Sequence, residues 1–189
     1  MAKFIVKPWT PELDLTFFYE ESKKRGFVNN ATEKMLVQSL SNEEEMMVWI
    51  VYYNNLPVAS FAAHKLDFLP GYRICTRICA FTDLMPLTSI RTRKEIADQH
   101  HITGQIFIPV TIDHYGRDKN FYISTHPSEV GTQRAVHNVW APALVSNNTI
   151  QLETIATYRG HEQHFWKLNV DVFDSIMKPM KEFEYILDK

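Results

Sequence analysis

The sequence predicts an α/β fold, in which a mixed β-sheet is flanked by helices on both faces. Three observations lead to this prediction. Helical patterns come early in the chain, strand-like runs cluster in its middle, and a strand–helix–strand succession follows. Such a succession needs a crossover that lies on a face of the sheet. The 189 residues suffice for one core, so we expect a single domain over residues 1–170 with a helical extension, residues 171–189, packed on it.

The chain begins with a short strand and two helices. Apolar residues 4–6 predict a strand. A helix is predicted over residues 10–26, because Pro11 fits a first helical turn and Gly26 can adopt the left-handed conformation that ends a helix. A second helix is predicted over residues 30–41, where the spacing of a capping box precedes an apolar stripe.

Three strands are predicted next. Residues 46–53 and 57–64 are rich in β-branched, aromatic and small apolar side chains, and Asn54-Asn55 between them tolerates the positive φ angles of a tight hairpin turn. Pro70-Gly71 predicts the following turn, and residues 72–81 form the third strand. One face of this third strand is mixed in character and carries Arg73, Cys75, Arg77, Cys79 and Phe81.

The crossover region follows. Residues 88–115 have helical propensity, with Gly104 and Pro109 as expected interruptions. Residues 121–125 form a compact apolar run that predicts a strand, and residues 132–140 fit a helix.

Two final strands and a helical tail complete the pattern. The strands are predicted over residues 150–158 and 164–170, with Arg159-Gly160 in the turn between them. Residues 171–188 read as helix, split at Pro179.

Composition and charge exclude several classes of protein. Twenty basic against 22 acidic residues give a net charge of −2, so we expect no general affinity for nucleic acid. No apolar run approaches the roughly 20 residues of a membrane span, and the N-terminus lacks a signal peptide. Cys75 and Cys79 are separated by about 13 Å along one predicted strand, too far for a disulfide. We therefore expect a cytoplasmic protein that binds no membrane and is a monomer or homodimer.

The histidines do not predict a metal site. Eight are present, but His161 and His164 are three positions apart, whereas the zinc-binding HExxH motif needs a separation of four. We expect no bound metal.

The order of elements resembles the GNAT superfamily of acyl-CoA-dependent acyltransferases over residues 3–170. The best local support is the hairpin Trp49-Ile50-Val51-Tyr52-Tyr53-Asn54-Asn55-Leu56-Pro57-Val58-Ala59-Ser60, in which a strand, a polar turn and a small-residue strand follow each other as in that family. The chain is also similar to divergent GNAT-like proteins of marine bacteria and their phages. The resemblance implies a GNAT-like central sheet. It also implies transfer of an acyl group, most often acetyl, from acetyl-CoA or another acyl-CoA to a small-molecule or peptide amine.

One departure from the family pattern concerns the phosphate-binding loop. In the family, the strand equivalent to residues 72–81 leads into a glycine-rich loop, Q/R-x-x-G-x-G/A, whose amides hold the pyrophosphate. Here no glycine lies between Gly71 and Gly104. Two readings of function stay open: an acyltransferase with a different phosphate site, or a GNAT-like binding or interaction module that has lost catalysis.

A basic cluster supplies the candidate replacement for the glycine loop. Arg91, Arg93 and Lys94 fall at the expected start of a helix, where an anion would offset the unfavourable interaction of three cations with the helix dipole. The other reading is a solvated basic turn. The residues that we expect to bind the acyl-CoA are Ala80, Phe81, Ser89, Arg91, Thr92 and Arg93.

The candidate catalytic residues follow predicted strands. Asp83 comes after the third strand and His126 after residues 121–125, at sheet ends where open α/β folds place ligands. Either could take the proton from an attacking amine. The other reading of His126, which precedes a proline, is a turn residue. In the family a tyrosine on the next helix serves as the acid, but residues 132–140 contain none. Arg77 could anchor a carboxylate or phosphate, or pair with a structural acid.

Overall fold

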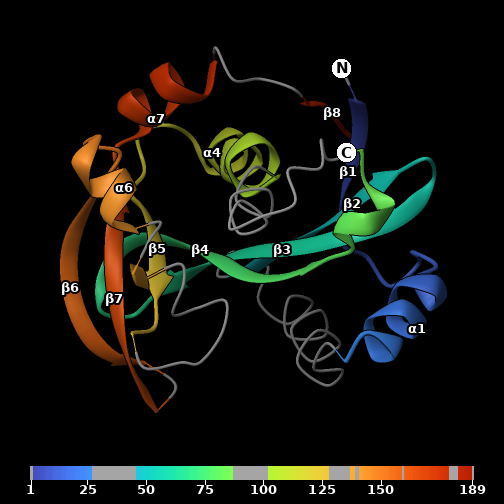
Figure 1. Cartoon of the computed structure of the whole chain (residues 1–189), viewed down its shortest axis with the longest axis horizontal. Helices are drawn as coiled ribbons and strands as arrows, with labels where there is room; N and C mark the ends of the chain where they lie inside the picture. Colours follow the sequence, from blue (N-terminus) through green and yellow to red (C-terminus); the bar gives the residue numbers. More distant parts are fainter. Residues whose placement is uncertain are drawn as a thin grey trace. The chain divides into compact units, whose positions relative to one another are not determined.

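The computed structural model describes residues 2–26, 46–86, 102–127, 137–138, 141–158, 160–178 and 183–188, and for residues 75–79 and 82 the backbone alone. Its strands form one mixed eight-stranded sheet in the order β6-β7-β5-β4-β3-β2-β1-β8 (Figure 1). This sheet and its helices confirm the predicted α/β class. The chain divides into two compact units, residues 1–65, 75–88 and 182–189, and residues 66–74 and 89–181. Among the described residues, no helix is long and apolar enough to cross a membrane.

The first unit is built on a β-hairpin, with two further strands on one side of it and one on the other. Its elements are β1 (Ala2–Pro8), α1 (Thr16–Lys24), β2 (Met46–Tyr53), β3 (Leu56–Leu66, up to Lys65), the end of β4 (Leu69–Ala80), the short 3-10 helix η1 (Thr82–Leu84) and β8 (Phe183–Leu187). Strand β2 pairs antiparallel with both β1 and β3, and β8 pairs parallel with β1. Asn54 and Asn55 have φ angles of 49° and 64°, which confirms the predicted hairpin turn.

The core of the first unit joins α1 to the sheet. Phe18 is fully buried, and its ring lies 5.2 Å from that of Phe81. The other buried members of this cluster are Leu15, Val48, Ile50 and Ala62. Complete burial of a Phe side chain contributes about 1.5–3 kcal/mol to folding, so these two rings are a main reason why α1 docks on the sheet.

The second unit contains a β-hairpin and a parallel pair of strands. Its elements are the start of β4, the π-helical turn η2 (Thr103–Phe107), α4 (Ile108–Tyr115), β5 (Phe121–Thr125), α6 (Ala141–Ser146), β6 (Ile150–Tyr158), β7 (His161–Leu168) and α7 (Val170–Met177). Tyr72 pairs with Phe121 in the parallel ladder of β4 and β5, and β7 pairs antiparallel with β5 and β6. The core between these strands and helices α4, α6 and α7 contains Ile74, Ile108, Ile112, Phe121, Ile123, Ala141, Ile150, Leu168 and Phe173.

Helix α1 begins six residues later than the sequence predicts. Residues 11–13 form a turn, and the Asp14 carboxylate accepts a hydrogen bond from the Thr16 N–H at 3.0 Å. This local bond gives the chain an alternative to helix before Thr16. The predicted end is confirmed, because Gly26 has a φ of +71°. The second predicted helix, residues 30–41, lies outside the described residues.

Two predictions, one of a turn and one of interruptions in a helix, were wrong. The turn after β3 is at Asp67 and Phe68, and Pro70 and Gly71 already belong to β4. Gly104 and Pro109 do not interrupt the helix that runs from 102 to 115. A π-helical turn changes the hydrogen-bond pattern just before Pro109, which has no N–H to donate, so the proline is accommodated without a break.

The C-terminal segment corrects another prediction. Helix α7 ends at Met177, and residues 183–187 form strand β8 instead of the expected helix. The reason is a non-local pairing, since β8 forms a parallel ladder with β1 that runs from Ala2–Phe183 to Val6–Leu187. Phe183 is buried there, with its ring 5.2 Å from that of Phe4. Strands β5 and β6 have the predicted bounds, whereas β7 begins three residues early, at His161.

Candidate functional site

A chain of polar contacts lies at the C-terminal end of β5, in the second unit. The Trp166 indole N–H donates to the Thr125 hydroxyl at 2.8 Å, and this hydroxyl lies 2.9 Å from Nδ1 of His137. The His137 ring meets the His164 ring edge to face at 4.6 Å. The antiparallel ladder explains the arrangement, because Thr125 pairs with His164 and Ile123 with Trp166. The sequence predicts no function for these contacts, because they join residues up to 41 positions apart.

The surroundings of His137 favour its neutral form. Burial lowers the pKa of His137, and the neighbouring His164 and His126 lower it further. A histidine with a pKa below its ordinary value of about 6.5 is neutral at pH 7, and so can accept a proton from another group.

His126, the predicted base, lies where the sequence analysis expected, directly after β5. Only 6% of its surface is exposed, and its ring centroid is 5.0 Å from that of His161 at the start of β7. Among the described residues, no three His, Cys, Asp or Glu side chains are arranged to hold a metal ion.

Asp83, the other predicted base, lies in the first unit and forms an ion pair. The Arg25 guanidinium donates to both carboxylate oxygens, with a distance of 2.9 Å from Nη2 to Oδ2, and also binds Glu21. These hydrogen bonds hold the pKa of Asp83 below its ordinary value. A carboxylate in this state is a weak base, so the contacts favour a structural role in which Asp83 holds the end of α1.

The Arg25–Asp83 pair makes the stability of the protein depend on pH. Since the Asp83 pKa is lower in the folded protein, the stabilisation is present above the unfolded value of about 3.9 and is lost as the pH falls through the folded value. The Asp83 side chain is 59% exposed, so we expect Asp83→Asn to reduce the free energy of unfolding by about 0.5–1 kcal/mol at pH 7. Urea unfolding at pH 7 and pH 3 measures this.

The control for this prediction is Asp118→Asn, which removes an exposed pair with the adjacent Lys119. The Asp83→Asn difference should shrink at pH 3. An equal difference at both pH values would mean that the substitution acts through something other than the ion pair.

Of the residues expected to bind the acyl-CoA, the structure describes Ala80 and Phe81 alone. Phe81 is fully buried in the core of the first unit, its N–H donates to the Val58 carbonyl at 2.8 Å, and the Arg25 guanidinium lies over its ring. Ser89, Arg91, Thr92 and Arg93 lie outside the described residues. So do the side chains of Arg77, Cys75 and Cys79, although the backbone places both cysteines on the one strand β4, as predicted.

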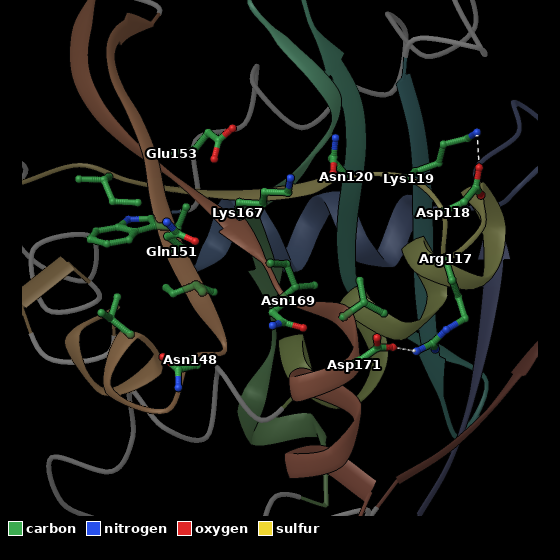
Figure 2. A pocket seen from close by; sticks show the side chains of 16 residues that line it. Arg117, Asp118, Lys119, Asn120, Asn148, Gln151, Glu153, Lys167, Asn169 and Asp171 are labelled. Atoms are coloured by element: carbon green, nitrogen blue, oxygen red, sulfur yellow. Dashed lines mark hydrogen bonds and ion pairs between the residues drawn. The ribbon is translucent and has the colours of Figure 1, made fainter.

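A separate groove of about 770 Å³ lies in the second unit, beside the segment that precedes β5 (Figure 2). Figure 2 shows the Lys119–Asp118 and Arg117–Asp171 pairs on its wall. Its charged lining residues balance, three basic against three acidic: Arg117, Lys119, Lys167, Asp118, Glu153 and Asp171. The groove is at the opposite end of β5 from His126 and has no excess of positive charge for a pyrophosphate.

Comparisons with known proteins identify the fold. No protein-family model and no curated protein matches the sequence. Solved structures do match. An acetyltransferase assigned to the GNAT family from Desulfovibrio desulfuricans matches with a TM-score of 0.55 and 10% identity over 88% of this chain and 99% of that one. The aminoglycoside N-acetyltransferase AAC(6')-Ib11 matches with a TM-score of 0.54 and 11% identity over 90% and 98%.

A third solved structure contains the coenzyme. AAC(6')-Ib in complex with ribostamycin and coenzyme A matches with a TM-score of 0.55 and 11% identity, over 91% of this chain and 96% of that one. At these identities the likeness concerns the fold. The GNAT-like central sheet expected from the sequence is confirmed.

Proposed function

We propose that this chain, which has the fold of the GNAT acetyltransferases, transfers an acyl group from acetyl-CoA or another acyl-CoA to an amine. The observation that carries the proposal is the match to solved acetyltransferases over about nine-tenths of this chain and nearly all of theirs. A cluster of histidines at the carboxyl end of β5, of which His126 is buried, supports it, because open α/β sheets bind ligands at that edge.

The reaction needs a base, and we propose His126. The acyl-CoA thioester supplies the activated acyl group. Its amine acceptor arrives as an ammonium and must lose a proton before its nitrogen can attack the carbonyl carbon, after which the carbon–sulfur bond breaks and the thiolate takes up a proton. A neutral imidazole can accept the first proton. His126 is the better candidate because the other one, Asp83, is committed to Arg25.

The residues that we propose to bind the phosphates of the acyl-CoA are Ser89, Arg91, Thr92 and Arg93. Guanidinium groups and hydroxyls are suited to phosphate oxygens, and two arginines supply the positive charge that backbone amides of a glycine loop would otherwise provide. This part rests on the sequence. Phe81 is included because it precedes that segment along the chain. Its own N–H already donates a hydrogen bond to the Val58 carbonyl.

Acetyl-CoA should raise the melting temperature. At 100 times its dissociation constant, a ligand that binds only the folded state adds about 2.7 kcal/mol to the free energy of unfolding. For a domain of this size that corresponds to a rise of about 5–11 °C. Thermal unfolding monitored by circular dichroism measures the shift, and arginine contacts to phosphate predict that it decreases with added salt.

The matched variants are Arg91→Ala with Arg93→Ala, which should abolish the shift, and Arg117→Ala, which should keep it because Arg117 is paired with the carboxylates of Asp171 and Asp174. Absence of a shift with acetyl-, malonyl- and long-chain acyl-CoA would refute the proposal. A shift without release of coenzyme A in the presence of primary amines would identify the chain as a binding module.

A further inference from the structure

Arg73 is a buried cation in the second unit, near the start of β4. Only 6% of its surface is exposed. Its Nε donates to the Ser124 hydroxyl at 2.8 Å, and its Nη2 donates to the Gln163 side-chain oxygen at 3.3 Å. The guanidinium carbon lies 4.9 Å from the centre of the Tyr158 ring. The remaining nitrogen, Nη1, is buried and has no hydrogen-bond partner among the described residues.

These neighbours accept hydrogen bonds from the guanidinium but do not neutralise its charge. Ser124 and Gln163 are uncharged, and among the described residues no carboxylate lies within ion-pair distance of Arg73. Burying a charge without a counter-ion is strongly unfavourable, and an orphaned nitrogen adds to the cost. Arg117 in the same unit shows the contrast, since it has two carboxylate partners, Asp171 and Asp174.

We propose that Arg73 binds the carboxylate group of a small-molecule ligand through Nη1. The donors left for it are the two N–H groups of Arg73 Nη1, since Nε and Nη2 are bonded to Ser124 and Gln163 on the opposite edge of the guanidinium. The charge selects the anion. One guanidinium among neutral partners matches the single charge of a carboxylate, whereas a phosphate dianion would leave an excess negative charge in a buried site.

Tyr158 forms the cover of this site. Its ring lies over the guanidinium and is half-buried at the end of β6, where Tyr158 pairs with His161 across the hairpin. A ligand therefore reaches Nη1 by displacing the Tyr158 ring. Gln163 is held in place by its own bond to the Tyr158 carbonyl at 3.5 Å, so its oxygen stays directed at Arg73.

The position of the site relates it to the proposed base. His126 follows Ser124 by two residues, about 6–7 Å along an extended chain, and its ring lies 5.0 Å from that of His161, the hairpin partner of Tyr158. If the ligand is the acyl acceptor, it carries an amine and a carboxylate separated by a few bonds. That identification rests on the proposed function, while the carboxylate site itself does not.

The test compares carboxylates with their neutral amides in the absence of coenzyme A. The probes are benzoate against benzamide and 4-aminobutyrate against 4-aminobutyramide, measured by calorimetric titration at pH 7 and by the shift of the Arg73 Nε–H resonance in ¹⁵N-labelled protein. We expect a carboxylate to bind at least tenfold more tightly than its amide and to move that resonance. Phenyl phosphate distinguishes the other oxyanion and should bind more weakly than benzoate.

Variants separate a binding site from a structural arginine. Arg73→Lys should weaken carboxylate binding at least tenfold, and Arg117→Lys should leave it unchanged. Arg73→Met should have a melting temperature equal to or above that of the natural protein, because it removes a buried charge with no counter-ion. Benzoate should raise the melting temperature of the natural protein but not that of Arg73→Met. If Arg73→Met does not fold, the lysine variant and the paired probes decide.

Equal affinity for carboxylates and amides would overturn the proposal, as would a tenfold preference for phenyl phosphate. These outcomes are distinct from failure of the proposed function, because they are read without an acyl-CoA. A chain that binds benzoate through Arg73 but releases no coenzyme A would retain the site and lose the acyltransferase assignment.

Discussion

His126→Gln is expected to lower kcat for acyl transfer by roughly 10²–10⁴-fold, the usual contribution of a positioned general base. Glutamine keeps much of the volume and polarity of the imidazole but cannot take a proton from the acceptor ammonium. His126 is buried directly after β5, so the natural side chain is held by its surroundings. The measurement is release of coenzyme A, followed with a thiol reagent, using the primary amine that gives the fastest release. KM should change much less than kcat, because the proton is removed in the chemical step.

The control is His114→Gln. His114 lies in the last turn of α4 beside Tyr115, outside the histidine cluster at the end of β5. We expect its kcat to stay within about twofold of the natural value. Asp83→Asn tests the other candidate base in the same assay. If Asp83→Asn reduced kcat by the larger factor and His126→Gln did not, the roles that we assign to these two residues would have to be exchanged.

Gly71→Ala is expected to destabilise the protein by about 3–5 kcal/mol. Gly71 has a φ of +140°, and a β-carbon there would lie 2.3 Å from the Asn120 carbonyl oxygen. The clash would displace a residue that holds β4 and β5 together. Asn120 accepts from the Tyr72 N–H at 2.9 Å and donates to the Pro70 carbonyl at 3.0 Å. Backbone strain and the loss of these bonds together account for the expected magnitude.

Gly160→Ala is the matched control for this prediction. Gly160 also has a positive φ, +82°, but nothing lies within 4 Å of the position of its β-carbon. The cost should therefore be that of the backbone conformation alone, about 1–2 kcal/mol. Urea unfolding of the two variants separates the contributions. A Gly71→Ala variant no less stable than Gly160→Ala would show that Asn120 can move away without disturbing the sheet.

The two glycines illustrate what a sequence can and cannot report. Gly71 follows a proline, and this pair predicts a turn, yet in the structure it lies within β4. A glycine is needed there because Asn120 approaches its backbone too closely for a side chain. The approach depends on a residue 49 positions away. Nothing local to Gly71 distinguishes a glycine needed for a turn from a glycine needed for packing.

The same distinction applies to the site. The position of His126 after an apolar strand was visible in the sequence, because residues 121–125 form a compact run with clear ends. The link from Thr125 to Trp166 and His137 was not, since it depends on the register of β5 against β7. In the sequence, Arg73 could be identified only as one charged residue on the mixed face of a predicted strand. Its burial and its lack of a counter-ion among the described residues follow from Ser124, Gln163 and Tyr158.

Local patterns alone were sufficient for the α/β class, the hairpin at Asn54 and Asn55, and strands β5 and β6, because backbone preference and side-chain alternation act over a few residues. Which strands pair with each other could be identified only from the folded structure. Residues 183–187 became a strand because the edge of β1 offered hydrogen bonds and a place for Phe183 against Phe4. Such contacts join distant segments, and their free energy exceeds the small intrinsic preference of five residues for helix or strand.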